Sequence, residues 1–362
     1  MSITILGANS ASGEYEISNS AAFFAEGYME RTQGTPTNAK KATISFWIRR
    51  ACNFGSSQTV LSWDSGGGSQ AYLRFANGSD QIQLFNDTAG ETDTSIITTQ
   101  VVRDPAAWYH FVLQWDSAQS TASNRVKFYL NGEQITSFGT ANYPPQNTDF
   151  ALNVNGNAID LGRWAAGSEY LESYLAEFHF VDGTISAHTD FGKFDDNNTW
   201  IPKQYGGVHG DNGFFLKFDQ TGTSANASGM GADSSGNGNH FSITDLPSTA
   251  IVTESPNLTW AYLSQISASD QEGSAGNIEN GGLRLPTGNK VHGLTHDNIM
   301  LDGGKWYFEV YMATSSNFNS TIGFRNNDNG DDGPSIEVEN DRQVKKDSSN
   351  VGSSGGNFAN GG

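Results

Sequence analysis

Apolar and polar residues alternate along the first part of the chain in short runs, as expected for β-strands whose two faces meet different surroundings. β-Branched and aromatic residues fill these runs, and Gly, Asn, Asp and Ser separate them. Asn77-Gly78 and Asn131-Gly132 are strong hairpin signals. The expected strands cover residues 43–50, 58–63, 71–75, 81–85, 108–115, 126–130 and 174–181. Regular short strands with turns between them indicate a β-sandwich.

The pattern changes after residue 220, and the change predicts three parts. Residues 1–220 should form the sandwich, with a last strand over 211–219. Residues 221–294 are rich in Ser, Gly and Asn and poor in long apolar runs, which predicts a long connector with a few short strands. Residues 295–362 begin a second β region around Trp306–Met312, with too few apolar residues after it to close a full sandwich. The fold class is therefore all-β, a jelly-roll sandwich plus a second, partial β-sandwich.

Composition narrows the classes of function. Lys plus Arg number 20 and Asp plus Glu 39, so the net charge of −19 disfavours binding to nucleic acid or to anionic lipid. The single Cys52 allows no intrachain disulfide, which fits assembly in a reducing cytoplasm. The start of the chain lacks the basic and apolar segments of a signal peptide, and no run reaches transmembrane length. We therefore expect no membrane insertion.

Several of the expected strands resemble a known family. Residues 108–112, followed by 126–132, are similar to the laminin-G-like pattern, in which a Trp-His pair opens one strand and the next ends in Asn-Gly. A narrower resemblance is to the laminin-G-like proteins of tailed bacteriophages, and several segments carry it in the same order. These segments are 14–20, 44–50, 215–218, 233–241, 254–257 and 303–309, the last with 321–324 looking like the start of a SPRY-like domain.

The resemblance implies a location and a role. Members of this phage family are structural proteins of the virion, so the chain is expected on the particle exterior after assembly in the host cytoplasm. Its partners would be other virion proteins, further copies of itself (a trimer by analogy with fibres) and a host surface glycan. We favour a tail fibre or tail-tip component. A capsid decoration or head-fibre protein is the first alternative, and a glycan-degrading hydrolase is the less favoured one.

The sequence offers little support for catalysis. Glucanases of the concanavalin-A-like fold carry a Glu-x-Asp-x-Glu or Glu-x-Asp-x-x-Glu run on one strand, and the chain has neither. Glu337, Glu339 and Asp341 alternate in a similar way, but outside the jelly-roll. The chain lacks His-Glu-x-x-His, and one Cys excludes a thiolate zinc cluster. We therefore expect no enzymatic activity and no catalytic residues.

Calcium is the only cofactor with a case in the sequence. Asp233, Ser235 and Asn237 place oxygen-bearing side chains at alternate positions, as the start of an EF-hand loop does. The closing Glu of such a loop is replaced by Thr244. We favour the alternative, a polar turn that is capped by its own Asp and Asn side chains.

Sugar binding is the remaining hypothesis about a site. Lectins of this fold stack exposed aromatic rings on sugars and bind the hydroxyl groups with Asn and Asp. Trp164 and the pair Trp63-Asp64 fall at expected strand ends, where such residues would lie. The alternative for both tryptophans is packing in the sandwich core. The candidate carbohydrate-binding residues are therefore Trp164, Trp63 and Asp64.

Overall fold

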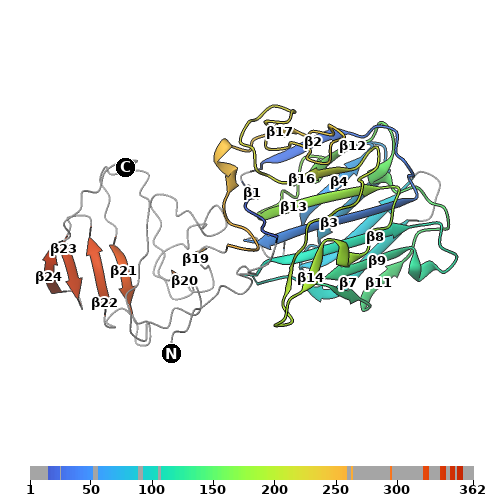
Figure 1. Ribbon diagram of the computed structural model, residues 1–362. Coiled ribbons are helices and arrows are strands. Elements are labelled where there is room, and N and C mark those ends of the chain that lie inside the picture. Colours follow the sequence, from blue (N-terminus) through green and yellow to red (C-terminus); the bar gives the residue numbers. More distant parts are fainter. Residues whose placement is uncertain are drawn as a thin grey trace. The chain divides into compact units, whose positions relative to one another are not determined.

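A computed structural model shows an all-β architecture (Figure 1). It describes residues 15–258, apart from residues 25, 52–55, 89–92 and 105–106, and the backbone of six later strands. Cys52 lies outside the described residues. Within the described part, no helix is long and apolar enough to cross a bilayer.

The first sheet has eight antiparallel strands in the order β10-β9-β8-β3-β13-β1-β18, with β16 also paired to β13. Its central strands are long and continuously buried, because both faces of this sheet are covered. The strands are β1 (Ser20–Phe23), β3 (Lys41–Arg50), β8 (Tyr109–Asp116), β9 (Val126–Leu130), β10 (Glu133–Ile135), β13 (Ser173–Asp182), β16 (Phe214–Leu216) and β18 (Ile251–Val252).

The second sheet also has eight antiparallel strands, in the order β11-β7-β6-β5-β4-β12-β2-β17. Its strands alternate between buried and more exposed positions, because one face meets the core and the other faces outward. The strands are β2 (Tyr28–Thr32), β4 (Gln58–Asp64), β5 (Gln70–Phe75), β6 (Gln81–Asp87), β7 (Thr94–Val101), β11 (Phe138–Asn142), β12 (Ala158–Leu161) and β17 (Ser242–Thr244).

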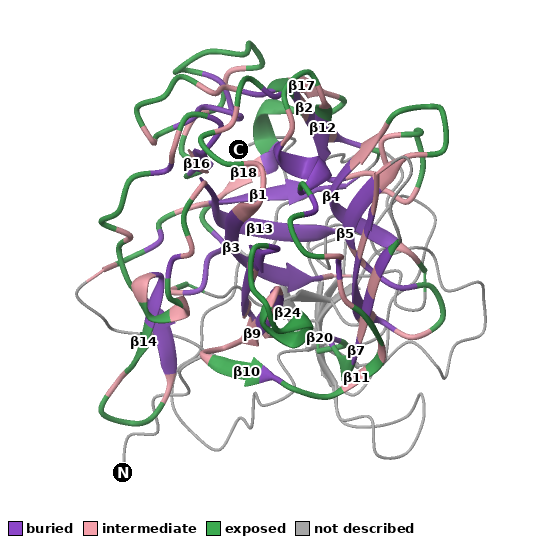
Figure 2. Ribbon diagram, turned by 90° about the vertical axis from the view of Figure 1, so that its right-hand side faces the viewer, coloured by how far each residue is buried: buried purple, intermediate pink, exposed green. Residues whose placement is uncertain are grey.

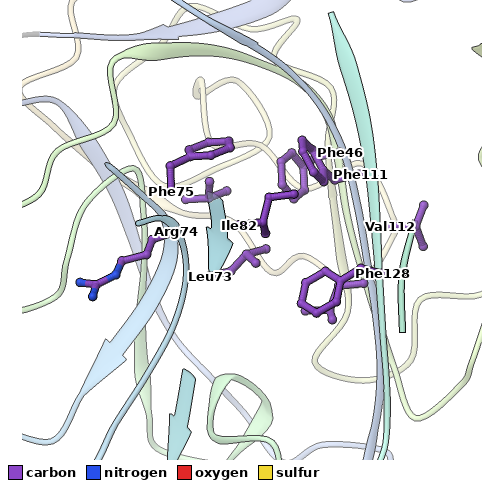
Figure 3. A pocket seen from close by; sticks show the side chains of 10 residues that line it. Phe46, Leu73, Arg74, Phe75, Ile82, Phe111, Val112 and Phe128 are labelled. Atoms are coloured by element: carbon purple, nitrogen blue, oxygen red, sulfur yellow. The ribbon is translucent and has the colours of Figure 1, made fainter. Parts of the chain in front are cut away.

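The core lies between the two sheets, where the strands are coloured as buried in Figure 2. Phe46 stacks on Phe111 and on Phe178, with ring centroids 5.6 and 5.2 Å apart. A cavity of about 10 Å³ remains among these side chains (Figure 3). Its walls are almost wholly apolar and it has room for about one water molecule, so it is a packing defect and not a ligand site. Among the labelled residues, Arg74 and Val112 point away from the space between the two sheets.

A covering layer buries polar side chains on the outer face of the first sheet. It includes the short strands β14 (Gly192–Phe194) and β15 (Trp200–Pro202). Trp200 Nε1 donates to His110 Nδ1 at 3.0 Å, and Ser45 Oγ lies 2.9 Å from His110 Nε2. Since an indole N–H can only donate, His110 is neutral, with its proton on Nε2.

The first domain extends beyond the expected limit at residue 220. β17 pairs with β2 and β18 pairs with β1, so residues 242–252 contribute to both sheets. Phe241 is fully buried, and its ring meets that of Phe214 edge to face at 4.8 Å. The prediction of a connector over 221–294 is therefore wrong for its first part. This segment has few apolar residues. Hydrogen bonds attach much of it to the sandwich, so its attachment does not require a continuous apolar pattern.

Glu254 attaches the end of the described segment to the first sheet. Its carboxylate is buried, 3.1 Å from Arg49 Nε, and it accepts a hydrogen bond from Trp108 Nε1 at 3.0 Å. The Arg49 guanidinium lies over the ring of Tyr174, 4.4 Å from its centroid. A buried charge with these partners is costly to separate, so residue 254 belongs to the sandwich.

A second unit covers residues 300–362. It contains an antiparallel four-stranded sheet in sequential order, which comprises β21 (Thr321–Arg325), β22 (Ser335–Glu339), β23 (Gln343–Lys346) and β24 (Ser349–Ser353). Two further strands, β19 (Tyr262–Leu263) and β20 (Leu294–Thr295), pair with each other. The strand expected over Trp306–Met312 lies outside the described residues, and the SPRY-like interpretation stays a prediction.

The protein has buried histidines, and we therefore expect its free energy of unfolding to decrease in acid. Burial lowers the pKa of His110 to about 3, and burial with the neighbouring His179 lowers that of His209 to about 4, both from 6.5. The folded state thus binds fewer protons than the unfolded chain below pH 6.5, and its stability falls as the pH drops toward 4. Urea unfolding between pH 7 and 4.5 should show this loss. The stability of His209→Gln should depend less steeply on pH. Stability that is constant over this range would contradict the prediction.

Replacement of Phe241 tests the extended domain limit. Phe241→Ala should reduce the free energy of unfolding by about 3–5 kcal/mol, because it removes a fully buried ring. Phe194→Ala is the matched control, since that ring is 41% exposed. If the two variants had equal midpoints of urea unfolding, residue 241 would belong to a connector and the extended domain limit would be contradicted.

Candidate functional site

A row of polar and aromatic side chains crosses the outer face of the second sheet. Strand pairing sets Phe85 opposite Tyr72, Tyr72 opposite Ser62 and Ser62 opposite Asp160, and the row continues to Glu30 on β2. The adjacent row along the strands holds Leu61, Leu73, Leu84 and Ile96, which face the core. The outer row is therefore fixed by the same register that buries the inner one.

Trp164 extends this row above the sheet. Its ring meets that of Tyr72 edge to face, with centroids 5.2 Å apart, and Tyr72 in turn stacks beside Phe85 at 5.2 Å. We call Tyr72, Phe85 and Trp164 the aromatic group. Trp164 and Phe85 are partly exposed, whereas Tyr72 is buried beneath its neighbours.

A short loop holds Trp164 in place. Ser62 Oγ donates to the carbonyl oxygen of Arg163 at 2.8 Å and accepts from the backbone N–H of Ala165 at 2.9 Å. The backbone N–H of Trp164 donates to the Ser168 carbonyl at 2.8 Å. Gly167 has a φ of +88°, which an L side chain rarely adopts. The indole is thus mounted on a turn that is hydrogen-bonded to β4, so little ordering would remain for ligand binding.

Arg74 and Glu169 form an ion pair beside the aromatic group. Arg74 Nη1 donates to both carboxylate oxygens of Glu169, at 2.9 and 2.8 Å, and Arg74 Nε donates to Gln83 Oε1 at 3.0 Å. Its guanidinium lies 4.2 Å from the centroid of Tyr72. Thr59 Oγ1 also donates to Glu169, at 3.1 Å. The guanidinium and carboxylate are half-buried and fix each other.

Asp160 and Arg163 form a second ion pair, on β12 and the loop after it. Arg163 Nε donates to Asp160 at 2.6 Å, and its Nη2 lies 3.9 Å from Glu30. Burial raises the pKa of Asp160 to about 6, against the opposing effect of Arg163 and with a further increase from Glu30. This carboxylate is therefore buried and paired.

The sequence predictions for sugar binding have different outcomes. Trp164 and Asp64 lie on or beside the outer face, with Asp64 at the end of β4 accepting a hydrogen bond from the Gly66 N–H at 2.7 Å. Trp63 points to the opposite side, because its strand partner is the buried Ala71 and its ring packs against the core. The packing interpretation fits Trp63, and the structure does not bring it to Trp164.

Sequence reasoning missed Tyr72, Phe85, Arg74 and Glu169. The alternation of residues 70–75 and 81–85 shows which positions share a face, but only the strand register brings them together. Glu169 reaches Arg74 across 95 positions of the sequence, and no local pattern indicates that contact.

The proposed calcium residues form a hydrogen-bonded turn. Asp233 Oδ1 accepts from the backbone N–H of Phe215 and Ser235, and Oδ2 accepts from Ser235 Oγ and the Asn239 N–H, all at 2.8–2.9 Å. Asn237 Nδ2 donates to the carbonyl oxygens of residues 210 and 213. This is the polar turn of the alternative interpretation. Calcium stays a prediction, and its binding would exchange these hydrogen bonds for metal bonds.

Replacement of Asp233 distinguishes the two interpretations. Asp233→Ala should lower the free energy of unfolding by about 1–3 kcal/mol, because three backbone N–H groups and one hydroxyl lose the buried carboxylate that accepts from them. Ser235→Ala should cost less, since the backbone bonds to Asp233 remain. Thermal midpoints should be the same in calcium chloride and in a chelator. A calcium-dependent increase that Asp233→Ala abolishes would favour the metal site.

A comparison with family models gives one match in the first domain. Residues 25–189 match the family model described as the concanavalin A-like lectin/glucanases superfamily (Laminin_G_3). No curated protein matches the chain. A similar solved structure is the heptameric SAP-like pentraxin of Limulus polyphemus, at 13% identity over 48% of this chain and 81% of that one, with a TM-score of 0.36.

Two other similar structures differ in kind. The CBM40 of the Ruminococcus gnavus IT-sialidase is 16% identical over 45% of this chain and 93% of its own, with a TM-score of 0.31. Tailspike protein 2 of Escherichia coli O157:H7 bacteriophage CAB120 is 14% identical over 47% of this chain and 23% of its own, with a TM-score of 0.34. Similarities this distant do not indicate the function of the chain, which has to be inferred from its own residues. The family match and the two packed antiparallel sheets give the first domain a concanavalin A-like, laminin-G-like jelly-roll fold.

Proposed function

We propose that this protein is a non-enzymatic component of a bacteriophage virion, of the tail fibre or tail-tip type, and that it contacts host surface glycans. The glycan would lie on the outer face of the second sheet. The observation that carries this proposal is the aromatic group, with Trp164 partly exposed and fixed in place by Ser62.

The chemistry of this face suits a carbohydrate. A sugar ring offers C–H groups on one face, which pack on an aromatic ring, and hydroxyl groups at its edge, which bind polar side chains. Asp64 and Gln70 are strand partners next to the row of the aromatic group, and both are partly exposed. Apolar and hydrogen-bonding groups thus alternate at the spacing of a pleated sheet.

Two features support binding without hydrolysis. Glycosidases need one carboxyl group that can donate a proton and a second carboxylate that acts as base or nucleophile. On this face, Glu169 is held by Arg74 and Asp160 by Arg163. The raised pKa values of Asp160 and Asp87 favour the hydrolase alternative, but the carboxylate of Asp160 is only 3% exposed.

The virion part of the proposal has separate support. It comes from the ordered resemblance of residues 14–20, 44–50, 233–241 and 303–309 to phage laminin-G-like proteins. In the structure, the first three of these ranges include β3 and the Asp233 turn, which are both parts of the sandwich scaffold. A scaffold is suited equally to a tail fibre and to the alternative, a protein that decorates the head.

Replacement of Trp164 tests the glycan contact. Trp164→Ala should weaken binding of the purified chain to host cells or to an extracted surface polysaccharide by about tenfold or more, because a stacked ring is lost. Phe194→Ala is the matched control, since it removes an exposed ring from β14 in the layer over the other sheet. Titration calorimetry with the extracted polysaccharide should give the control variant the same affinity as the unmodified chain.

The outcomes of the same experiment separate the alternatives. Unchanged binding by folded Trp164→Ala would move the contact elsewhere and contradict the proposal. Release of reducing sugar from the polysaccharide, lost in Asp160→Asn, would favour the hydrolase. Antibody label over the head lattice of intact particles, and not at the tail, would favour the decoration protein.

A further inference from the structure

Carboxylates lie in the row next to the aromatic group on the outer face of the second sheet. Asp64 and Asp87 are the strand partners that flank Gln70, one on each side. Burial and the neighbouring carboxylate of Asp93 raise the pKa of Asp87. We call Asp64, Asp87 and Asp93 the acidic rim.

The cations of this face are already paired. The four strands β4, β5, β6 and β12 contain one basic residue, Arg74, and the loop over residues 162–170 contains one more, Arg163. Arg74 is bound to Glu169, Gln83 and the Tyr72 ring. Arg163 is bound to Asp160 and lies 3.3 Å from the centroid of the Tyr28 ring.

An anionic ligand would therefore meet repulsion without compensation. The charge of each guanidinium is already balanced by a protein carboxylate, Glu169 for Arg74 and Asp160 for Arg163, so a sugar carboxylate would gain little net attraction from either of them. No such repulsion arises for a hydroxyl group or an amine. The amine would gain attraction from the acidic rim.

We propose that this face selects among glycans by charge, binding neutral or amine-bearing sugars and rejecting those with carboxylate or sulfate groups. The inference rests on the proposed function, because it places the sugar on the aromatic group. It adds the class of glycan, which neither the fold nor the aromatic rings determine.

The expected size of the effect follows from Coulomb's law. A carboxylate about 8 Å from a ligand charge changes affinity about twofold in a water-like dielectric, so a rim of this size gives about eightfold at low salt. The effect should shrink as salt is added, since the Debye length is about 10 Å at 0.1 M.

A printed array of matched glycans, each present with and without one sialic acid or sulfate group, provides the test. At low salt, the neutral member of each bound pair should retain the purified chain about eightfold better, and added salt should narrow the difference. The double variant Asp64→Asn, Asp87→Asn should also reduce the difference in retention between the neutral and the anionic member of each pair. Asp211→Asn with Asp219→Asn is the matched control, because it removes the same charge from exposed positions beside β16.

Each outcome bears on a different part of the inference. Anionic members that bind as well as neutral ones would overturn the charge selection and leave the glycan contact standing. A preference that survives in the rim variant would overturn the role of Asp64 and Asp87. A chain that retains no glycan of either kind would overturn both this inference and the proposed function.

Discussion

The alternation of side chains along a β-strand is the constraint on which the rest of this structure depends. Once Leu61, Leu73 and Leu84 are buried between the sheets, Ser62, Tyr72 and Phe85 must face outward. A shift of one residue in any of these pairings would exchange the two sets. The candidate site therefore requires no separate positioning device beyond the packing of the core, except for the loop that carries Trp164.

The two sheets use their outer faces differently, and the difference explains where a ligand could bind. Polar groups on the outer face of the first sheet are closed off by partners within the chain, as Glu254 is by Arg49 and His110 is by Trp200. On the outer face of the second sheet, within the described residues, the short loop with Trp164 lies over the aromatic rings. This face therefore keeps partly exposed rings beside polar groups, which is what a sugar requires.

The sequence predicts the sandwich well, because strand alternation is a local property. The expected strand 43–50 is observed as Lys41–Arg50, and 126–130 is observed as Val126–Leu130. Trp164 could be placed in advance at a strand end, but its neighbours Tyr72 and Arg74 could not, since their contacts depend on pairing between distant segments. Residues 221–258 were misassigned for the same reason. Their attachment depends on a few positions such as Phe241 and Glu254, and not on a continuous apolar pattern.

Pairing of arginine with carboxylate has two consequences for this face. Arg74 and Arg163 allow carboxylates to stay half-buried beside aromatic rings, where isolated charges would be unfavourable. The same pairing engages Glu169 and Asp160, which could otherwise act as acid or base, and it balances the charge of both guanidinium groups. The proposed binding without hydrolysis and the proposed discrimination by charge thus rest on the same two ion pairs. In a chain of net charge −19, this pairing would leave contact with the proposed glycan to rings, amides and the carboxylates of the acidic rim.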